Sequence, residues 1–170
     1  IRRYYSVNRL VERIPMGLHD FVHTGAEAIL VMPSLAYIVG LVYDVLIPIS
    51  QLKKTIDDKT LEEAFYKSAL LVRLQNDVGT NLLEMDQDSR HKLVLSLAQK
   101  VNPDEIAPNI YELIQHVARE DVVFTRMGKD IDFGEFNIAL QQLNPNNPIE
   151  TELHQLADSL DDIAKIYRFE

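Results

Sequence analysis

The 170-residue sequence contains no cysteine, and this absence excludes several kinds of chemistry. A chain without thiols forms no disulfide, binds no metal through thiolates and has no cysteine nucleophile. Disulfides are typical of oxidising compartments, so we expect a cytoplasmic protein. No secretory signal peptide is visible in the sequence.

Positive charge is also scarce, because 17 Lys and Arg residues stand against 26 Asp and Glu residues and give a formal net charge of -9. No basic cluster is present that would neutralise a row of phosphates, so we expect no nucleic-acid binding. An acidic chain that binds a phosphorylated substrate needs metal ions between the two.

Long hydrophobic runs are missing as well. The most apolar segment, ILVMPSLAYIVGLVY at residues 29–43, is interrupted by Pro33. It is also shorter than the roughly 20 apolar residues that cross a bilayer. We therefore expect a buried helix here and no membrane span.

Alternating strand patterns are scarce, whereas helical periodicity recurs along the chain and 46% of the residues are hydrophobic. We predict a single all-α domain over residues 1–170. Proline, glycine and asparagine mark the expected breaks, as in LNPNNPIE at residues 143–150. The expected helices cover residues 2–14, 18–32, 34–50, 60–86, 89–100, 106–127, 132–143 and 149–168.

The start of the helix over 60–86 is rich in acids. Asp57, Asp58 and Glu62 could form a metal-binding cluster, but Thr60 followed by Glu63 matches a capping box. Acids at a helix N-terminus also complement the helix dipole. We interpret these residues as the start signal of the helix.

Three oxygen-bearing side chains are spaced four residues apart in LVRLQNDVGTNLLEMDQ, residues 71–87: Asn76, Thr80 and Glu84. On a continuous helix these positions drift by only about 80°, and Arg73 falls in the same arc. The opposite side carries an apolar stripe, formed by Leu71, Leu74, Val78 and Leu82. The pattern predicts an amphipathic helix with an unusual polar face.

Amide, hydroxyl and carboxylate oxygens are the hard ligands that Mg²⁺ prefers, with water and phosphate completing its shell. Asn76, Thr80 and Glu84 would supply half of such a shell. The spacing alone also fits solvated surface residues, with Thr80 bonding back to its own helix. Both readings stay open at this point.

The string NDVGTNLLE, Asn76 to Glu84, resembles the second metal-binding motif of class I terpene synthases, and the preceding RLQ matches as well. The resemblance implies that Asn76, Thr80 and Glu84 bind Mg²⁺, which Mn²⁺ could replace. It also implies that Arg73 contacts the substrate diphosphate and that Asp77 assists from outside the metal's shell.

Two further segments resemble the same family. HTGAEA, residues 23–28, is similar to a broken helix in which a small residue, here Gly25, lets a backbone carbonyl approach the substrate. IYRFE places Arg168 near the Arg-Tyr pair that closes over the substrate diphosphate in this family, with Phe169 in place of the tyrosine. The resemblance thus implies a catalytic role for Arg168. Phe21 stands where the family has a diphosphate-sensing arginine.

The resemblance implies an antiparallel helix bundle of the isoprenoid-synthase type, of which this chain matches the C-terminal half. It implies a lyase that ionises and cyclises an allylic prenyl diphosphate with loss of diphosphate. The family's aspartate-rich first metal motif is not found before Asn76. We therefore expect a missing N-terminal half or a partner chain to supply it, and a homo-oligomer stays open.

Two other functions compete with this interpretation. His19 and His23 at i and i+4 would share a helix face, with Asp20 where zinc proteases carry a glutamate. The chain could instead be a non-catalytic helical interaction protein or subunit.

Overall fold

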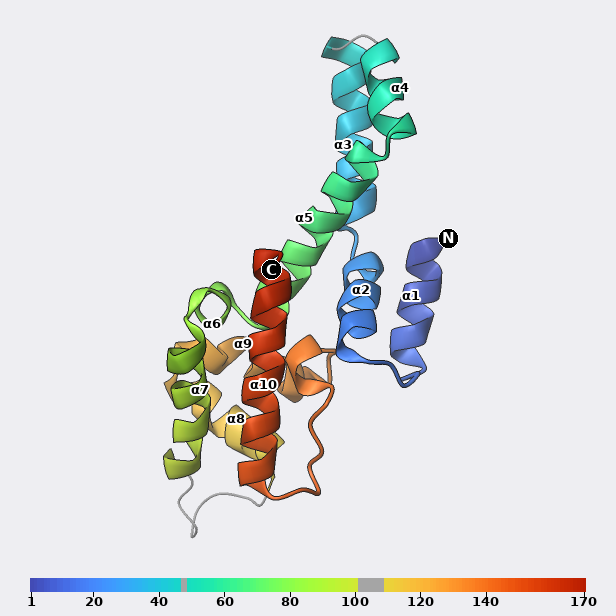
Figure 1. Cartoon of the computed structure of the whole chain (residues 1–170). Helices are drawn as coiled ribbons and strands as arrows, with labels where there is room; N and C mark the ends of the chain where they lie inside the picture. The colour runs from blue at the N-terminus through green and yellow to red at the C-terminus, as the bar shows by residue number, and fades with distance from the viewer. Residues whose placement is uncertain (47–48, 101–108) are drawn as a thin grey trace. The chain divides into compact units, whose positions relative to one another are not determined.

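The computed structural model describes all residues except 47–48 and 101–108, and every regular element among the described residues is a helix (Figure 1). The all-α prediction is confirmed. Backbone contacts group the residues into two compact units, a first unit Ile1–Arg73 and a second unit Leu74–Glu170. A single domain over residues 1–170 stays a prediction.

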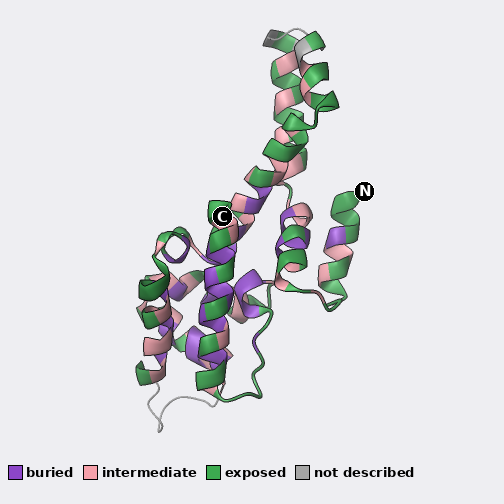
Figure 2. Cartoon of the chain, in the orientation of Figure 1, coloured by how far each residue is buried: buried purple, intermediate pink, exposed green. Residues whose placement is uncertain are grey.

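The first unit contains four helices and most of a fifth: α1 (Arg2–Val11), α2 (Leu18–Ala28), α3 (Val31–Leu46), α4 (Ile49–Asp57) and α5 (Thr60–Asp77). α1 packs against α2, and α3 packs against α4. Among the described residues of this unit, the buried apolar side chains are Val22, Ala26, Ala69 and Leu70. Figure 2 shows that α3 and α4 are partly or fully exposed along their described length, so the prediction of a buried helix over residues 29–43 is wrong.

Pro33 does not end a helix, contrary to the predicted boundary at residues 32–34. The break lies at Ile29 and Leu30, and Pro33 belongs to the first turn of α3. The N–H groups of a first turn have no partner within the helix, so proline costs nothing there. The predicted helix over 34–50 is correspondingly divided into α3 and α4, with residues 47–48 outside the described part.

The predicted capping box at the start of α5 is wrong. Asp58 accepts a hydrogen bond from the Thr60 N–H at 3.0 Å. The hydroxyl and N–H of Thr60 hold the pKa of Asp58 below its ordinary value. Glu63 instead pairs with Lys67 at 2.7 Å, one turn along the helix. The acids still mark the start of the helix, and Asp58 is the residue whose carboxylate accepts the hydrogen bond there.

The second unit holds the end of α5 and eight further elements. They are α6 (Thr80–Glu84), α7 (Gln87–Ser96), η1 (Leu97–Lys100), α8 (Ile110–Glu120), η2 (Val122–Phe124), α9 (Thr125–Phe133), η3 (Ile138–Leu140) and α10 (Ile149–Arg168). α10 packs on α6 and α7, and α8 packs on α9. The α8–α9 contact is close, because a Cβ on Gly128 would lie 2.3 Å from the Ala118 Cβ.

Helix ends in the second unit follow local chemistry. α10 covers the predicted residues 149–168, with acids in its first turn and Lys165 and Arg168 in its last. The predicted helix over 132–143 is wrong, because α9 ends at Gly134 in the left-handed conformation and only the short η3 follows. The predicted helix over 106–127 divides into α8, η2 and the start of α9, and residues 106–108 lie outside the described part.

No single helix in the described residues is both long and apolar enough to cross a membrane. α2 and Val31–Tyr43 of α3 pass that test as a pair, by length and composition only, with a bend of 44° between them.

Candidate functional site

The segment with the three oxygen side chains is not one continuous helix. α5 ends at Asp77, Gly79 adopts a φ of 89°, and α6 begins at Thr80. Glycine tolerates a positive φ because it has no Cβ. The predicted single helix over 60–86 is therefore wrong, and the spacing of Thr80 and Glu84 from Asn76 is not set by one helical repeat.

Burial nevertheless separates this segment into two sides. Asn76, Thr80 and Glu84 are all exposed. The predicted apolar stripe is buried at Leu74, Val78 and Leu82 and partly exposed at Leu71. The turn at Gly79 thus keeps the apolar residues in the core of the second unit and the oxygen side chains accessible to solvent.

A cation lies next to this accessible side. The Arg126 Nη2 of α9 donates a hydrogen bond to the Asn76 Oδ1 at 3.4 Å, and both side chains are exposed. The amide oxygen of Asn76 is thus already directed at a positive charge. Arg73 lies three residues earlier on α5 and is partly exposed. Sequence reasoning missed Arg126, since no local pattern connects residues 50 positions apart.

Asp77 is buried and has a structural role. Its Oδ2 accepts a hydrogen bond from the Ile138 N–H at 2.9 Å, and its carbonyl accepts one from the Asn137 Nδ2 at 2.7 Å. The same amide group of Asn137 donates to the Asp130 Oδ2 at 2.7 Å. These bonds hold the start of η3 against the end of α5 and fix the residue beside Asn76.

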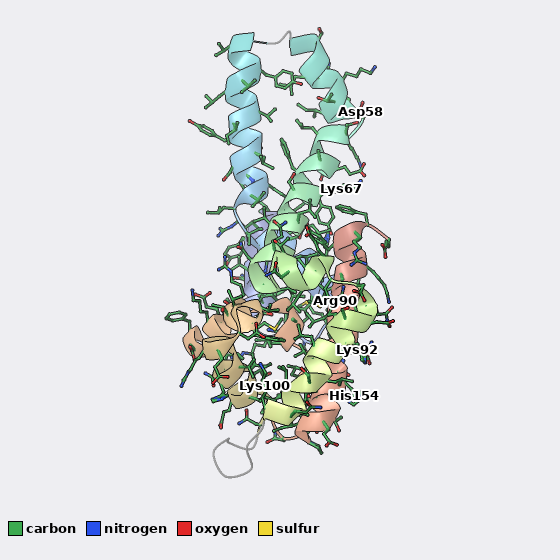
Figure 3. All side chains as sticks on the ribbon, turned by 90° about the vertical axis from the view of Figure 1, so that its left-hand side faces the viewer. Asp58, Lys67, Arg90, Lys92, Lys100 and His154 are labelled. Atoms are coloured by element: carbon green, nitrogen blue, oxygen red, sulfur yellow. The ribbon has the colours of Figure 1, made fainter. Side chains whose placement is uncertain are left out.

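The C-terminal end of α6 is held by two arginines. Arg90, buried on α7 and labelled in Figure 3, donates from Nε to the Leu82 carbonyl at 2.8 Å and from Nη2 to the Met85 carbonyl. Arg168 of α10 donates from Nη2 to the Met85 carbonyl at 2.9 Å and to the Leu83 carbonyl at 3.3 Å. The arginine that the resemblance assigns to substrate closure therefore contacts the last turn of α6.

A buried ion pair accompanies these contacts. The Arg90 Nη1 is paired with the Asp161 Oδ1 of α10, and the two side chains are 2% and 5% exposed. The His91 Nδ1 lies 3.5 Å from the other Asp161 oxygen. Charges this deeply buried require a partner, so Arg90 and Asp161 tie α6, α7 and α10 together.

Gly25 is buried inside α2, which continues to Ala28. The helix break expected within HTGAEA is therefore wrong, because α2 is continuous through these residues and the next break lies at Ile29 and Leu30.

His23 is engaged on both ring nitrogens. Its Nδ1 lies 3.0 Å from the Tyr66 hydroxyl and its Nε2 lies 3.5 Å from Glu27, whose other oxygen accepts from Ser6 at 2.8 Å. Burial raises the pKa of Tyr66, and the charge of Glu27 raises it further. His19 is exposed one turn before. No group of three His, Asp or Glu residues in the described ranges could hold a metal ion, so the histidine pair has no third ligand there.

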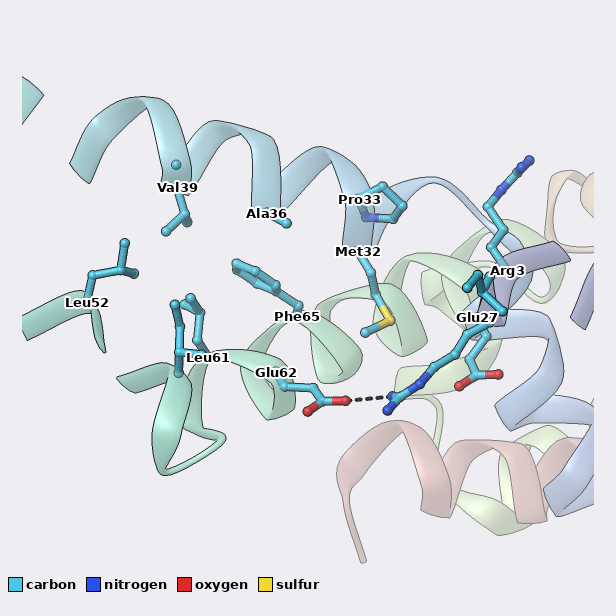
Figure 4. Close-up of a pocket in the computed structure, with 14 residues that line it drawn as sticks. Arg3, Glu27, Met32, Pro33, Ala36, Val39, Leu52, Leu61, Glu62 and Phe65 are labelled. Carbon is cyan, nitrogen blue, oxygen red and sulfur yellow. Dashed lines mark hydrogen bonds and ion pairs between the residues drawn. The ribbon is translucent and has the colours of Figure 1, made fainter. Parts of the chain in front are cut away.

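The first unit also contains an apolar groove of about 740 Å³ between α3, α4 and α5 (Figure 4). Phe65 of α5 projects toward α3, and Arg2 pairs with Glu62 at 2.6 Å at one end of the groove. Its charged lining is Arg2, Arg3, Glu27 and Glu62, and the rest of its lining is Ile1, Met32, Pro33, Ala36, Val39, Gly40, Leu52, Ile56, Leu61 and Phe65. The sequence did not single out this groove.

No protein-family model, curated protein or solved structure matches this chain.

Proposed function

We propose that this chain carries an Mg²⁺-binding surface for the ionisation and cyclisation of an allylic prenyl diphosphate, as a class I terpene synthase does. The observation that carries the proposal is the accessibility of Asn76, Thr80 and Glu84 on a segment whose other side is packed into the core. The donor set fits the metal, because all three side chains offer hard oxygen atoms and one of them carries a negative charge. Mn²⁺ suits the same donors.

Each residue has a definite task in this proposal. Asn76, Thr80 and Glu84 hold the metal, which when bound neutralises the negative charge of the departing diphosphate. Arg73 and Arg126 add positive charge for the same oxygens. Arg126 would have to exchange its bond with Asn76 for one with the diphosphate. Asp77, Arg90 and Arg168 hold the backbone on which the ligands sit.

The proposal includes a second set of oxygen ligands from an aspartate-rich motif on another segment or a partner chain. Ionisation of a diphosphate by this family needs metals bridged between two sets, so we expect the 170 residues alone to turn over little substrate. A cytoplasmic location is part of the same proposal.

The experiment uses Mg²⁺ and inorganic diphosphate as probes and measures the melting temperature of the chain. We expect the two together to raise the melting temperature when neither does so alone, because each completes the binding site of the other. Glu84→Gln should abolish this rise, since it removes the ligand charge. Glu63→Gln, the same change at an exposed glutamate of α5, should leave the rise intact.

Two results would overturn the proposal. One is the absence of any joint effect of Mg²⁺ and diphosphate, and the other is an equal loss in Glu84→Gln and Glu63→Gln. A positive binding result should be followed by an assay with a prenyl diphosphate in the presence of the partner that supplies the aspartate-rich motif.

A second function is favoured by a separate observation. The exposed apolar side chains of α3 are typical of a surface that binds another protein. A non-catalytic helical subunit would show this surface and no response to Mg²⁺ with diphosphate. The melting experiment therefore separates the two functions.

A further inference from the structure

α3 is apolar on two opposite faces. Its sequence has no charged residue from Val31 to Tyr43. At 100° per residue, the groove-lining positions Met32, Ala36 and Gly40 point about 180° away from the row that contains Ile38. A helix that is apolar all round is buried on all sides in a folded assembly. One face of α3 borders the groove within the first unit, and the other needs a second cover.

The second face is exposed. Ile38, Leu41 and Val45 are 53%, 52% and 77% exposed, and Tyr37 and Val42 beside them are exposed as well. The spacing of this row is three and four residues, so the side chains form one continuous strip along the helix. Scattered exposed apolar residues are ordinary, whereas a contiguous strip marks an interaction surface.

The strip has the spacing of a heptad pattern. Val31, Ile38 and Val45 occupy the a positions of a heptad pattern, and Ser34 and Leu41 occupy the d positions. β-Branched residues at a with leucine at d favour parallel pairs of helices. A heptad strip is also self-complementary, so an identical strip on a second copy fits it.

We propose that α3 is the contact helix of a homodimer, in which the strips of two copies pack in parallel about a twofold axis. The exposed parts of the five apolar side chains amount to roughly 600 Å² per copy, or about 1,200 Å² in total, which is the lower end of specific interfaces. The proposal does not depend on metal binding at Glu84.

Charge supports a second copy meeting through this unit. The first unit has nine Lys and Arg residues and eight Asp and Glu residues, whereas the second has eight and eighteen. Net charges of +1 and -10 mean that two first units approach each other without strong repulsion, while second units repel. Electrostatic repulsion therefore opposes a twofold interface least where that interface lies on the first unit.

The absence of cysteine makes the proposal directly testable. Leu41→Cys places one thiol at a d position, where two copies in parallel register bring the thiols together. Mild oxidation should convert most of this variant to a covalent dimer on a non-reducing gel. Val122→Cys, at a position that is 78% exposed on η2, should stay monomeric on that gel and serves as the matched control.

Sedimentation equilibrium of the unmodified chain gives the second readout. We expect a dimer at micromolar concentration, dissociation by Leu41→Glu with an unchanged helical circular dichroism spectrum, and no dissociation by Val122→Glu. A monomeric wild-type chain would overturn the proposal, as would a dimer that Leu41→Glu leaves intact. A monomer whose binding to phosphatidylcholine vesicles is lost in Leu41→Glu would also overturn it, by showing that the strip faces lipid.

Discussion

The second unit buries 22 of the described apolar residues, whereas the first unit buries four, although both units are built from amphipathic or apolar helices. Thirteen of the sixteen large apolar residues that are exposed in the described ranges lie in the first unit. The second unit thus forms its own core, while the first unit keeps apolar surface available. The proposed association through the first unit and the proposed binding segment of the second unit both rest on this difference in burial.

The two units should differ most in how much stability they lose when a phenylalanine is replaced by alanine. Phe124→Ala removes a fully buried ring of the second unit and should lower the free energy of unfolding by about 3–5 kcal/mol. Phe65→Ala in the first unit opens no closed cavity, because the ring is partly exposed at the groove, and should cost less than about 2 kcal/mol. Urea unfolding followed by circular dichroism measures both, and equal losses would contradict the comparison.

The buried ion pair gives a second test within the core of the second unit. Asp161→Ala leaves Arg90 charged and without its carboxylate, so we expect a loss of about 3–5 kcal/mol in the free energy of unfolding.

The neighbouring Asp162→Ala is the control. Its carboxylate is 59% exposed and pairs with Lys165 at 2.9 Å, so its loss should cost less than about 1 kcal/mol. Similar losses in the two variants would show that the buried pair does not stabilise the unit.

Adjacent residues of the proposed metal segment should separate structure from binding. Asp77→Ala leaves the Ile138 N–H without its acceptor and should destabilise the protein by about 1–3 kcal/mol. Asn76 is exposed, so Asn76→Ala should change the free energy of unfolding by no more than about 0.5 kcal/mol. The same substitution should weaken the joint response to Mg²⁺ and diphosphate. A stability loss in Asn76→Ala as large as that in Asp77→Ala would remove this distinction.

The smallest expected changes in stability come from replacing a glycine by alanine, and they have opposite signs in the two units. Gly79→Ala should lower the free energy of unfolding by about 1–2 kcal/mol, because the φ of 89° strains any residue with a Cβ. Space is not the cause, since no atom lies within 4 Å of a Cβ added at this position. Gly40→Ala lies in the middle of α3, where a Cβ also meets nothing, and should stabilise the chain by about 0.5–1 kcal/mol. Thermal melts of both variants check the two signs.

Helix content was predictable from periodicity, and α10 most clearly, because Pro148 and acidic residues precede a regular apolar pattern. The break at Gly79 was not predictable in the same way. Leu74, Val78 and Leu82 keep their apolar spacing across it, and spacing reports which side chains are buried rather than the φ of a glycine between them. The end of α9 at Gly134 was not predictable for the same reason, because it lies inside a segment that was expected to be helical.

The candidate site was predictable only in its local part. Asn76, Thr80 and Glu84 are close in sequence, and their exposure follows from the burial of the residues between them. The contact of Arg126 with Asn76 joins residues 50 positions apart, and the pair of Arg90 with Asp161 joins residues 71 positions apart. Such contacts depend on how helices pack, which no pattern within one helix encodes.

The two arginines on the last turn of α6 have a consequence for binding entropy. A helix of five residues does not persist through its own hydrogen bonds. Arg90 and Arg168 hold its final carbonyls, so the backbone beneath Thr80 and Glu84 becomes ordered when the second unit folds. In the proposed binding of metal and diphosphate, that loss of conformational freedom would not be repeated when the ligand arrives. A preorganised segment of this kind would keep a larger part of the contact energy as affinity.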